Sequence, residues 1–109
     1  MENENITFYI YILRCENNIL YTGITTDYIR RFNEHISKSK KSAKFTKSHR
    51  AEKIVAIWKT KTRSNALKLE AQIKKLTKNE KELLIESNMY FRIYFSTLFD
   101  CRKYRRMSI

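Results

Sequence analysis

The sequence predicts an α+β fold in which a three-stranded antiparallel sheet is flanked by helices. Two short segments near the N-terminus are rich in aromatic and β-branched residues, and further along the apolar residues recur at helical spacing. The chain has 109 residues, of which 42% are hydrophobic and 31% charged, so it can bury one modest core. With one glycine and no proline, it contains no flexible linker that would mark a second domain.

The first two strands are predicted to form a hairpin. They span residues 7–14 (TFYIYILR) and 19–25 (ILYTGIT), and a three-residue turn at 16–18 separates them. With that turn length Cys15 lies opposite Ile19, and side chains alternate between two faces along each strand. One face then carries the aliphatic residues Ile10, Ile12, Leu20 and Ile24, and the other carries Tyr9, Tyr11, Tyr21 and Gly23.

A helix and a third strand are predicted after the hairpin. The helix runs from about Asp27 to Ser37, and Thr26 or Asp27 is placed to cap its start. Its apolar stripe consists of Ile29, Phe32 and Ile36. Residues 53–59 (KIVAIWK) form the predicted third strand, and their apolar run is typical of a central or well-covered position.

Two more helices are predicted in the second half of the chain. The sequence Thr62-Arg63-Ser64 opens the first of them, whose apolar stripe consists of Ala66, Leu69, Ile73 and Leu76. Residues 77–80 (TKNE) have the pattern of a capping box and open the second, which carries Leu83 and Leu84.

The aromatic and basic tail at residues 87–109 has no pattern that assigns an element. We expect residues 1–86 to form the principal domain, with the tail packed on that domain or exposed. An exposed tail would favour a homodimer through its aromatic residues Tyr90, Phe91, Tyr94 and Phe95.

The charge of the chain predicts a polyanionic partner. Lysine and arginine number 23 against 11 acidic residues, which gives a formal net charge of +12. Each phosphate that Lys or Arg neutralises releases condensed counterions, so such a surface favours nucleic acid. The alternatives are a charge that serves solubility alone, or a basic protein-interaction or ribosome-associated factor.

The remaining composition favours a protein of the cytoplasm, or of the nucleoid where its nucleic acid lies. The two cysteines, Cys15 and Cys101, are far apart and form no CxxC pair, so we expect reduced thiols and no zinc knuckle. The first residues (MENEN) lack the features of a signal peptide, and no segment has the roughly 20 apolar residues of a membrane span.

The hairpin carries two motifs that resemble those of the GIY-YIG endonucleases. Tyr9-Ile10-Tyr11 is followed ten residues later by Tyr21-Thr22-Gly23, with Tyr9 in place of the first motif's glycine. Arg31, His35 and Glu70 follow at positions like those of the family's arginine, histidine and glutamate. The blocks YIYILRC, LYTGITTD, RRFNEH and RSNALKLEAQIKKLTKNEK are most similar to the small stand-alone YhbQ-like bacterial proteins.

The resemblance implies hydrolysis of phosphodiester bonds, for which these residues have suitable chemistry. Tyr11 or Tyr21 could take the proton of the attacking water if nearby positive charge lowered its pKa, and Arg31 could hold a phosphate through two hydrogen bonds. His35, with an ordinary pKa, could relay a proton. Glu70 is expected to hold Mg²⁺, or Mn²⁺ in its place.

Each of these residues also has a purely structural interpretation. Tyrosine is a good strand former and commonly packs, Arg31 suits a solvated helix face, and His35 suits a surface or capping position. Glu70 is spaced to form an ion pair with Lys74.

A second set of residues is predicted to contact nucleic acid directly. Gly23 lies mid-strand, where glycine favours close approach of another backbone, here that of the nucleic acid. Residues 38–50 contain six basic residues and no acidic one, and an aromatic residue that could stack on a base. The predicted contacts are Lys38, Lys40, Lys41, Lys44, Phe45, Lys47 and Arg50, although such charge runs are often only solvated.

Together these features predict a metal-dependent endonuclease that acts on DNA, with RNA as the alternative substrate. One active site on a small domain favours nicking or structure-directed cutting, as in DNA repair or recombination. The rival hypothesis is a non-catalytic nucleic-acid-binding module on the same scaffold.

Overall fold

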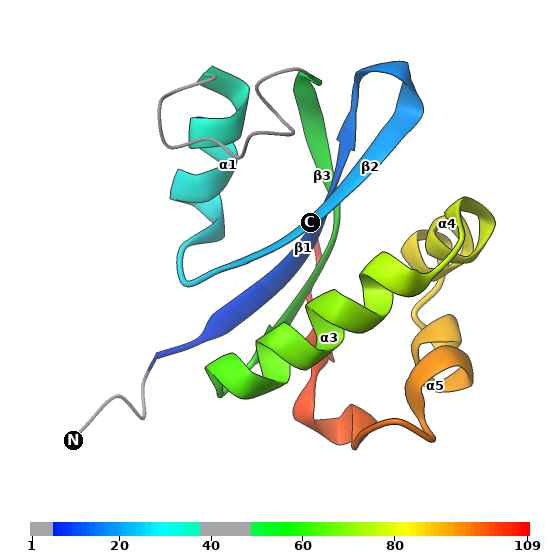
Figure 1. Ribbon diagram of the computed structural model, residues 1–109. Helices are drawn as coiled ribbons and strands as arrows, with labels where there is room; N and C mark the ends of the chain where they lie inside the picture. Colours follow the sequence, from blue (N-terminus) through cyan, green and yellow to red (C-terminus); the bar gives the residue numbers. More distant parts are fainter. Residues whose placement is uncertain (1–5, 38–48) are drawn as a thin grey trace.

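The computed structural model describes residues 6–37 and 49–109 as one sheet with helices on both faces (Figure 1). The strands are β1 (Phe8–Cys15), β2 (Ile19–Thr25), β3 (Ala51–Thr60) and β4 (Arg105–Arg106). The α-helices are α1 (Tyr28–Ser37), α3 (Arg63–Lys75), α4 (Lys78–Glu86) and α5 (Met89–Phe95). Two short 3₁₀ turns, η1 (Glu16–Asn18) and η2 (Cys101–Lys103), complete the described elements.

The sheet is antiparallel and has the strand order β2-β1-β3-β4. The predicted α+β class is confirmed, but the sheet has four strands because residues Arg105 and Arg106 pair with Lys59 and Trp58. The third predicted strand is central, between β1 and β4, and it is longer at both ends than its apolar run indicated.

The hairpin has the predicted three-residue turn and register. Cys15 pairs with Ile19, and Tyr11 pairs with Gly23 across the ladder. Asn17 and Asn18 have φ values of 62° and 61°, a left-handed conformation that asparagine tolerates better than most residues. The turn therefore places Tyr11 and Tyr21 on the same face of the sheet.

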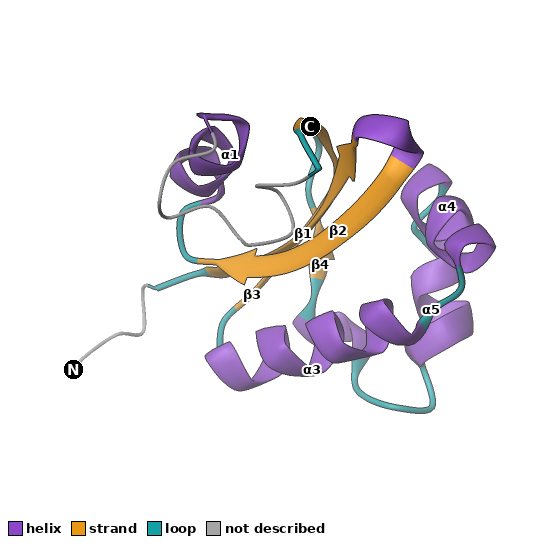
Figure 2. Ribbon diagram, turned by 45° about the horizontal axis from the view of Figure 1, so that its top comes forward, coloured by secondary structure: helices purple, strands orange, loops and turns teal. Residues whose placement is uncertain are grey.

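The two faces of the sheet have different cores and different helices. Helices α3, α4 and α5 lie on one side of the sheet and α1 lies on the other (Figure 2). The larger core packs Ile10, Ile12 and Trp58 of the sheet against Leu69 and other side chains of these helices. The smaller core contains Tyr11, with Tyr21, Tyr28 and Phe32 packed against it.

The helix starts are capped as the sequence predicts. The Asp27 carboxylate accepts the backbone N–H of Arg30, and the Thr62 hydroxyl accepts that of Asn65. Thr77 and Glu80 form the reciprocal capping box of α4. These bonds satisfy N–H groups that a helix leaves without partners in its first turn.

The apolar stripe predicted for α1 is wrong. The side chains of Ile29 and Ile36 are 63% and 45% exposed, whereas His35 is fully buried. The reason is that α1 covers a sheet face lined by tyrosines, and it turns Phe32 and His35 toward that face. The inward face of this helix is therefore the one that carries potential catalytic groups.

The tail completes the larger core. Phe91 and Phe95 of α5 are buried beside Trp58, and Tyr104 packs against the same aromatic cluster. Arg106 stacks over the Trp58 ring and donates to the carbonyls of Leu84 and Ile85 at the end of α4. Phe91 and Phe95 are buried, and Tyr90 and Tyr94 are partly buried. Helix α5 therefore exposes less aromatic surface than the homodimer expectation assumed, and the homodimer itself stays a prediction.

The structure also shows the burial of the two cysteines and the character of the helices. Cys15 is buried, Cys101 is partly buried, and neither forms a disulfide. Among residues 6–37 and 49–109, none of the helices has the length and apolar character that crossing a membrane requires.

Candidate active site

Two tyrosines on the paired strands of the hairpin form the centre of the site. Tyr11 lies on the central strand β1 and is almost fully buried, while Tyr21 on β2 is partly exposed. Their ring centroids are 6.4 Å apart. The shared face predicted from the turn length thus brings both phenols to one side of the sheet.

Gly23 provides the space that the Tyr11 ring occupies. A Cβ atom on Gly23 would lie 2.5 Å from the Tyr11 hydroxyl oxygen and 2.7 Å from Cζ, closer than such atoms approach. The backbone of Gly23 has no positive φ, so its conformation does not require glycine. The prediction that Gly23 admits a nucleic-acid backbone needs correction, because the side where that backbone would approach is filled by Tyr11.

His35 of α1 contacts both tyrosines from the opposite side. Its Nε2 lies 3.0 Å from the Tyr11 hydroxyl oxygen, and its ring centroid is 5.5 Å from that of Tyr21. Burial, followed by the positive charge of Arg31, lowers the pKa of His35 to about 4. The expected ordinary pKa is therefore wrong, and the imidazole is neutral at neutral pH.

Arg31 lies one helical turn before His35 and joins the same cluster. Its guanidinium donates to Glu34 at 2.9 Å, and its positive charge acts on the Tyr11 phenol, where it lowers the pKa. The tautomer of the neutral imidazole sets which partner donates in the hydrogen bond between the Tyr11 hydroxyl and Nε2 of His35. Arg30, the next residue toward the N-terminus, is exposed and pairs with the other oxygen of Glu34.

The pKa values of both phenols are raised, which contradicts the expected activation by positive charge. For Tyr11 the largest cause is burial, followed by the neighbouring Tyr21, and both outweigh the lowering effect of Arg31. Burial is also the largest cause for Tyr21. Neither tyrosine is a ready phenolate, so proton removal from water requires a second acceptor.

Glu70 of α3 supplies a carboxylate whose charge acts on both phenols. That charge raises the pKa of Tyr11 and of Tyr21, and the Glu70 side chain is 19% exposed. Its Oε2 lies 3.4 Å from Nζ of Lys74, one helical turn away, as the structural interpretation expected. The pair leaves the carboxylate partly exposed, and its charge is felt by both phenols.

A metal ion at this site would depend on few protein ligands. In the described parts of the chain, no group of three or more His, Cys, Asp or Glu side chains is arranged to hold an ion. Mg²⁺ is commonly held by one or two carboxylates together with water and substrate phosphates. A single accessible carboxylate such as Glu70 fits that ion better than it fits zinc, which requires several nitrogen or sulfur ligands.

Most of the predicted nucleic-acid contacts lie outside the described residues. These are Lys38, Lys40, Lys41, Lys44, Phe45 and Lys47. Arg50 is described and exposed at the start of β3, where its backbone exchanges hydrogen bonds with Glu16.

Sequence reasoning missed two residues of the site. Glu34 connects Arg30 and Arg31, and a hydrogen bond from Arg31 is the largest cause that lowers the pKa of Glu34. Its spacing of three and four residues from the two arginines was the available signal. Tyr28 packs edge-on against Tyr9, with ring centroids 4.9 Å apart, and so extends the aromatic surface beside Tyr11.

Comparison of the sequence with known proteins identifies the family of the chain. The sequence model of the GIY-YIG catalytic domain matches residues 7–83. A UPF0213 protein of Fusobacterium nucleatum is 45% identical over 80 residues, which are 73% of this chain and 78% of that protein. The UPF0213 protein YhbQ of Salmonella paratyphi B is 37% identical over 91 residues, covering 84% and 89% of the two chains.

A solved structure is also similar. The solution structure of the UPF0213 protein BH0048 from Bacillus halodurans has 36% sequence identity and a TM-score of 0.45, and it covers 73% of this chain and 83% of that one. The match of the catalytic-domain model to most of the chain, together with the two sequence relatives, decides the family. The chain belongs to the GIY-YIG catalytic-domain family and is similar to its small UPF0213 members.

Proposed function

We propose that the protein is a metal-dependent endonuclease that hydrolyses phosphodiester bonds in DNA and cuts one strand at each active site. The observation that supports this most is the hydrogen bond between Tyr11 and His35, beside which Tyr21 lies and on which the charges of Arg31 and Glu70 act. It offers a proton acceptor, a fixed cation and a carboxylate around one aromatic surface. The family to which the chain belongs supports the same class of reaction.

In the proposed reaction, Tyr11 passes its proton to His35 as it takes one from water. Nε2 of the neutral imidazole has a lone pair for this proton, and the two atoms are already 3.0 Å apart. Without substrate the raised pKa of the phenol and the lowered pKa of the imidazole keep the proton on oxygen. A bound phosphate places negative charge beside the pair, and this charge stabilises the imidazolium that the transfer creates.

Arg31 and Glu70 are assigned the electrostatic roles. The Arg31 guanidinium keeps its charge and would donate to the phosphoryl oxygens, on which negative charge grows in the transition state. Glu70 would hold the Mg²⁺ or Mn²⁺, which when bound stabilises charge on the phosphoryl and departing oxygens. Tyr21, the more exposed phenol, lines the same surface and remains the alternative base.

A cleavage assay with a matched pair of variants tests this proposal. Supercoiled, branched, duplex and single-stranded DNA would be incubated with the protein, with Mg²⁺, with Mn²⁺ and without metal. Arg31→Ala removes the cation next to Tyr11, whereas Arg30→Ala removes an exposed cation that shares the same partner, Glu34. We expect Arg31→Ala to slow cleavage on the order of 100-fold, as loss of one transition-state donor does, and Arg30→Ala to have little effect.

The outcomes separate the proposal from its rivals. DNA binding without cleavage of any substrate under any metal condition would support the non-catalytic module. Weak binding with a shallow salt dependence would favour a protein-interaction or ribosome-associated factor. Equal activity of the Arg31→Ala and Arg30→Ala variants would remove Arg31 from the site.

A further inference from the structure

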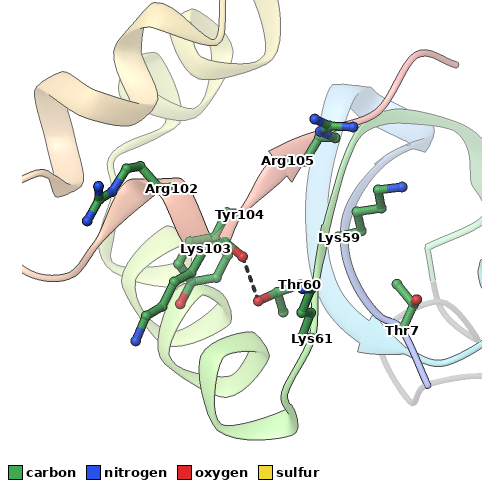
Figure 3. Close-up of a pocket in the computed structure, with 8 residues that line it drawn as sticks. All are labelled: Thr7, Lys59, Thr60, Lys61, Arg102, Lys103, Tyr104 and Arg105. Atoms are coloured by element: carbon green, nitrogen blue, oxygen red, sulfur yellow. Dashed lines mark hydrogen bonds between the residues drawn. The ribbon is translucent and has the colours of Figure 1, made fainter. Parts of the chain in front are cut away.

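A basic hollow lies at the C-terminal end of β3, where η2 and β4 return along the sheet (Figure 3). Its volume is about 390 Å³. Five of its eight lining residues are cationic and none is acidic. The cationic residues are Lys59, Lys61, Arg102, Lys103 and Arg105.

Most of these cations lack an acidic partner among the residues that the structure describes. Arg102 forms an ion pair with Asp100 at 3.0 Å, and its guanidinium points away from Lys59 and Arg105 (Figure 3). The other four have no ion pair with any residue in 6–37 or 49–109. Ion pairs with the described residues therefore do not neutralise these four charges.

Two of the cations are paired directly across the sheet. Lys59 of β3 lies opposite Arg105 of β4 in the antiparallel ladder, so both side chains leave the same face. Like charges in such positions repel and destabilise the strand pair. A bound anion between them would turn this unfavourable arrangement into a favourable one.

The walls of the hollow are held in place by partly buried hydrogen bonds. The Thr60 hydroxyl donates to the carbonyl of Lys103 at 2.8 Å, and the Tyr104 hydroxyl donates to the carbonyl of Asn65 at 2.7 Å. The Tyr104 ring packs against Phe91 and Phe99 in the larger core. The segment that carries Lys103 and Arg105 is thus fixed to β3 and α3 before any ligand binds.

The hollow is located where a nucleic acid held at the proposed active site could reach it. Lys59 pairs with Tyr9 across β1 and β3, and Tyr9 shares its face with Tyr11 two residues further along. Lys59 and Arg105 therefore lie on the tyrosine-bearing side of the sheet. The three residues from the C-terminal segment, Arg102, Lys103 and Arg105, lie beyond the part of the chain that matches the family's catalytic domain.

We propose that this hollow binds phosphates of the nucleic-acid strand next to the scission point and so positions the substrate. The inference rests on the proposed function, because it takes the anion to be the backbone of the same nucleic acid. A site with several cations, most of which lack an acidic partner, suits a ligand with repeating phosphates better than a ligand with a single carboxylate. The C-terminal segment would then supply a substrate contact of its own.

DNA binding measured without metal tests the hollow separately from cleavage. The variant Lys61→Gln/Lys103→Gln/Arg105→Gln removes three cations from the hollow, and the control Lys53→Gln/Lys75→Gln/Arg92→Gln removes three exposed cations that do not line it. Binding of a labelled duplex would be titrated in EDTA over a series of salt concentrations. Both variants have the same net charge, so any difference in their DNA affinity comes from where the removed cations lie.

We expect the hollow variant to bind DNA roughly tenfold or more weakly, and the control to change affinity only a few-fold. The slope of log Kd against log salt should fall by about 0.9 for each phosphate that the variant no longer neutralises. If the wild type binds DNA but never cleaves it, the proposed reaction is wrong. The comparison of the two triple variants still tests whether the hollow binds DNA.

Two results would overturn the inference. Equal losses in the two triple variants would mean that net charge alone attracts DNA. A hollow variant that binds DNA as tightly as the wild type would mean that the hollow does not bind nucleic acid. Thermal unfolding of each variant checks that it folds. If the triple variant does not fold, the single change Lys61→Gln, at an exposed residue just after β3, replaces it. This change should lower the slope of log Kd against log salt by about one third of the amount expected for the triple variant.

Discussion

At position 23 the requirement for glycine comes from a side chain on the neighbouring strand. Any Cβ there would meet the ring of Tyr11, which is held from the other side by His35. The glycine is therefore a condition for the Tyr11–His35 hydrogen bond, although it takes no part in chemistry. Sequence alone shows an isolated glycine in a strand, but the partner that fills its space depends on the register.

The change Gly23→Ala should destabilise the protein and impair cleavage. Alanine in a strand gains up to about 1 kcal/mol over glycine, but overpacking against a buried ring costs about 1 to 3 kcal/mol, so the clash decides the sign. Chemical denaturation measures the loss. In a Tyr11→Ala background the same change should be neutral or stabilising, and a loss of equal size in both backgrounds would contradict this explanation.

Protonation of His35 should make the protein less stable in mild acid. Burial holds its pKa at about 4 when folded, against about 6.5 when unfolded. Between these values the unfolded chain binds the proton and the folded chain does not, so stability falls as the pH falls. The loss between pH 7 and pH 4.5 should be on the order of 2 kcal/mol.

Urea denaturation across this pH range measures the effect, with His35→Gln as the comparison. The variant lacks the titrating group, so its stability should vary less with pH from 7 to 4.5 than that of the wild type. Parallel pH profiles for the two proteins would show that His35 does not carry the dependence.

At the scale of elements, local patterns predicted the hairpin, α3 and α4 well. Turn length set the hairpin register, and capping residues such as Thr62 and Thr77 marked helix starts, because these signals act within a few residues. The inward face of α1 could not be predicted from apolar spacing. Its partner surface is built by tyrosines on another element, and that surface accommodates His35 in preference to Ile29 or Ile36.

The elements of the tail, α5 and β4, depend on contacts that are distant in sequence. Phe91 packs on Trp58, and Arg105 and Arg106 pair with β3, which local patterns do not reveal. The same holds for the raised pKa of Tyr11 and the lowered pKa of His35, since burial is a property of the assembled fold. Sequence predicted most residues of the candidate site, but it missed Glu34 and Tyr28 and did not predict the protonation of the tyrosines and the histidine.

Because α5 shares the larger core, the change Phe95→Ala should destabilise the whole protein. Truncation of a buried phenylalanine costs about 3 to 5 kcal/mol, while Ile93→Ala, on the exposed side of the same helix, should cost far less. Thermal unfolding followed by circular dichroism compares the two variants. A Phe95→Ala protein with wild-type stability would indicate that the tail is not part of this core.

At the scale of the whole molecule, one small sheet brings together groups that are far apart in the chain. The hairpin contributes two phenols, α1 contributes Arg31 and His35, and α3 contributes the carboxylate of Glu70. Two cations of the basic hollow built by β3 and the tail, Lys59 and Arg105, lie on the tyrosine-bearing side of the same sheet. We propose that the fold thereby combines cleavage chemistry with backbone binding in a chain of 109 residues.

Cleavage of DNA by the Glu70→Ala variant, measured beside Lys74→Ala, tests this account most directly. The two changes remove opposite members of one ion pair, so only the first removes the carboxylate assigned to Mg²⁺. We expect Glu70→Ala to lower the metal-dependent rate by a factor on the order of 100 or more, and Lys74→Ala to retain most of it. Undiminished metal-dependent cleavage by Glu70→Ala would contradict the proposed active site.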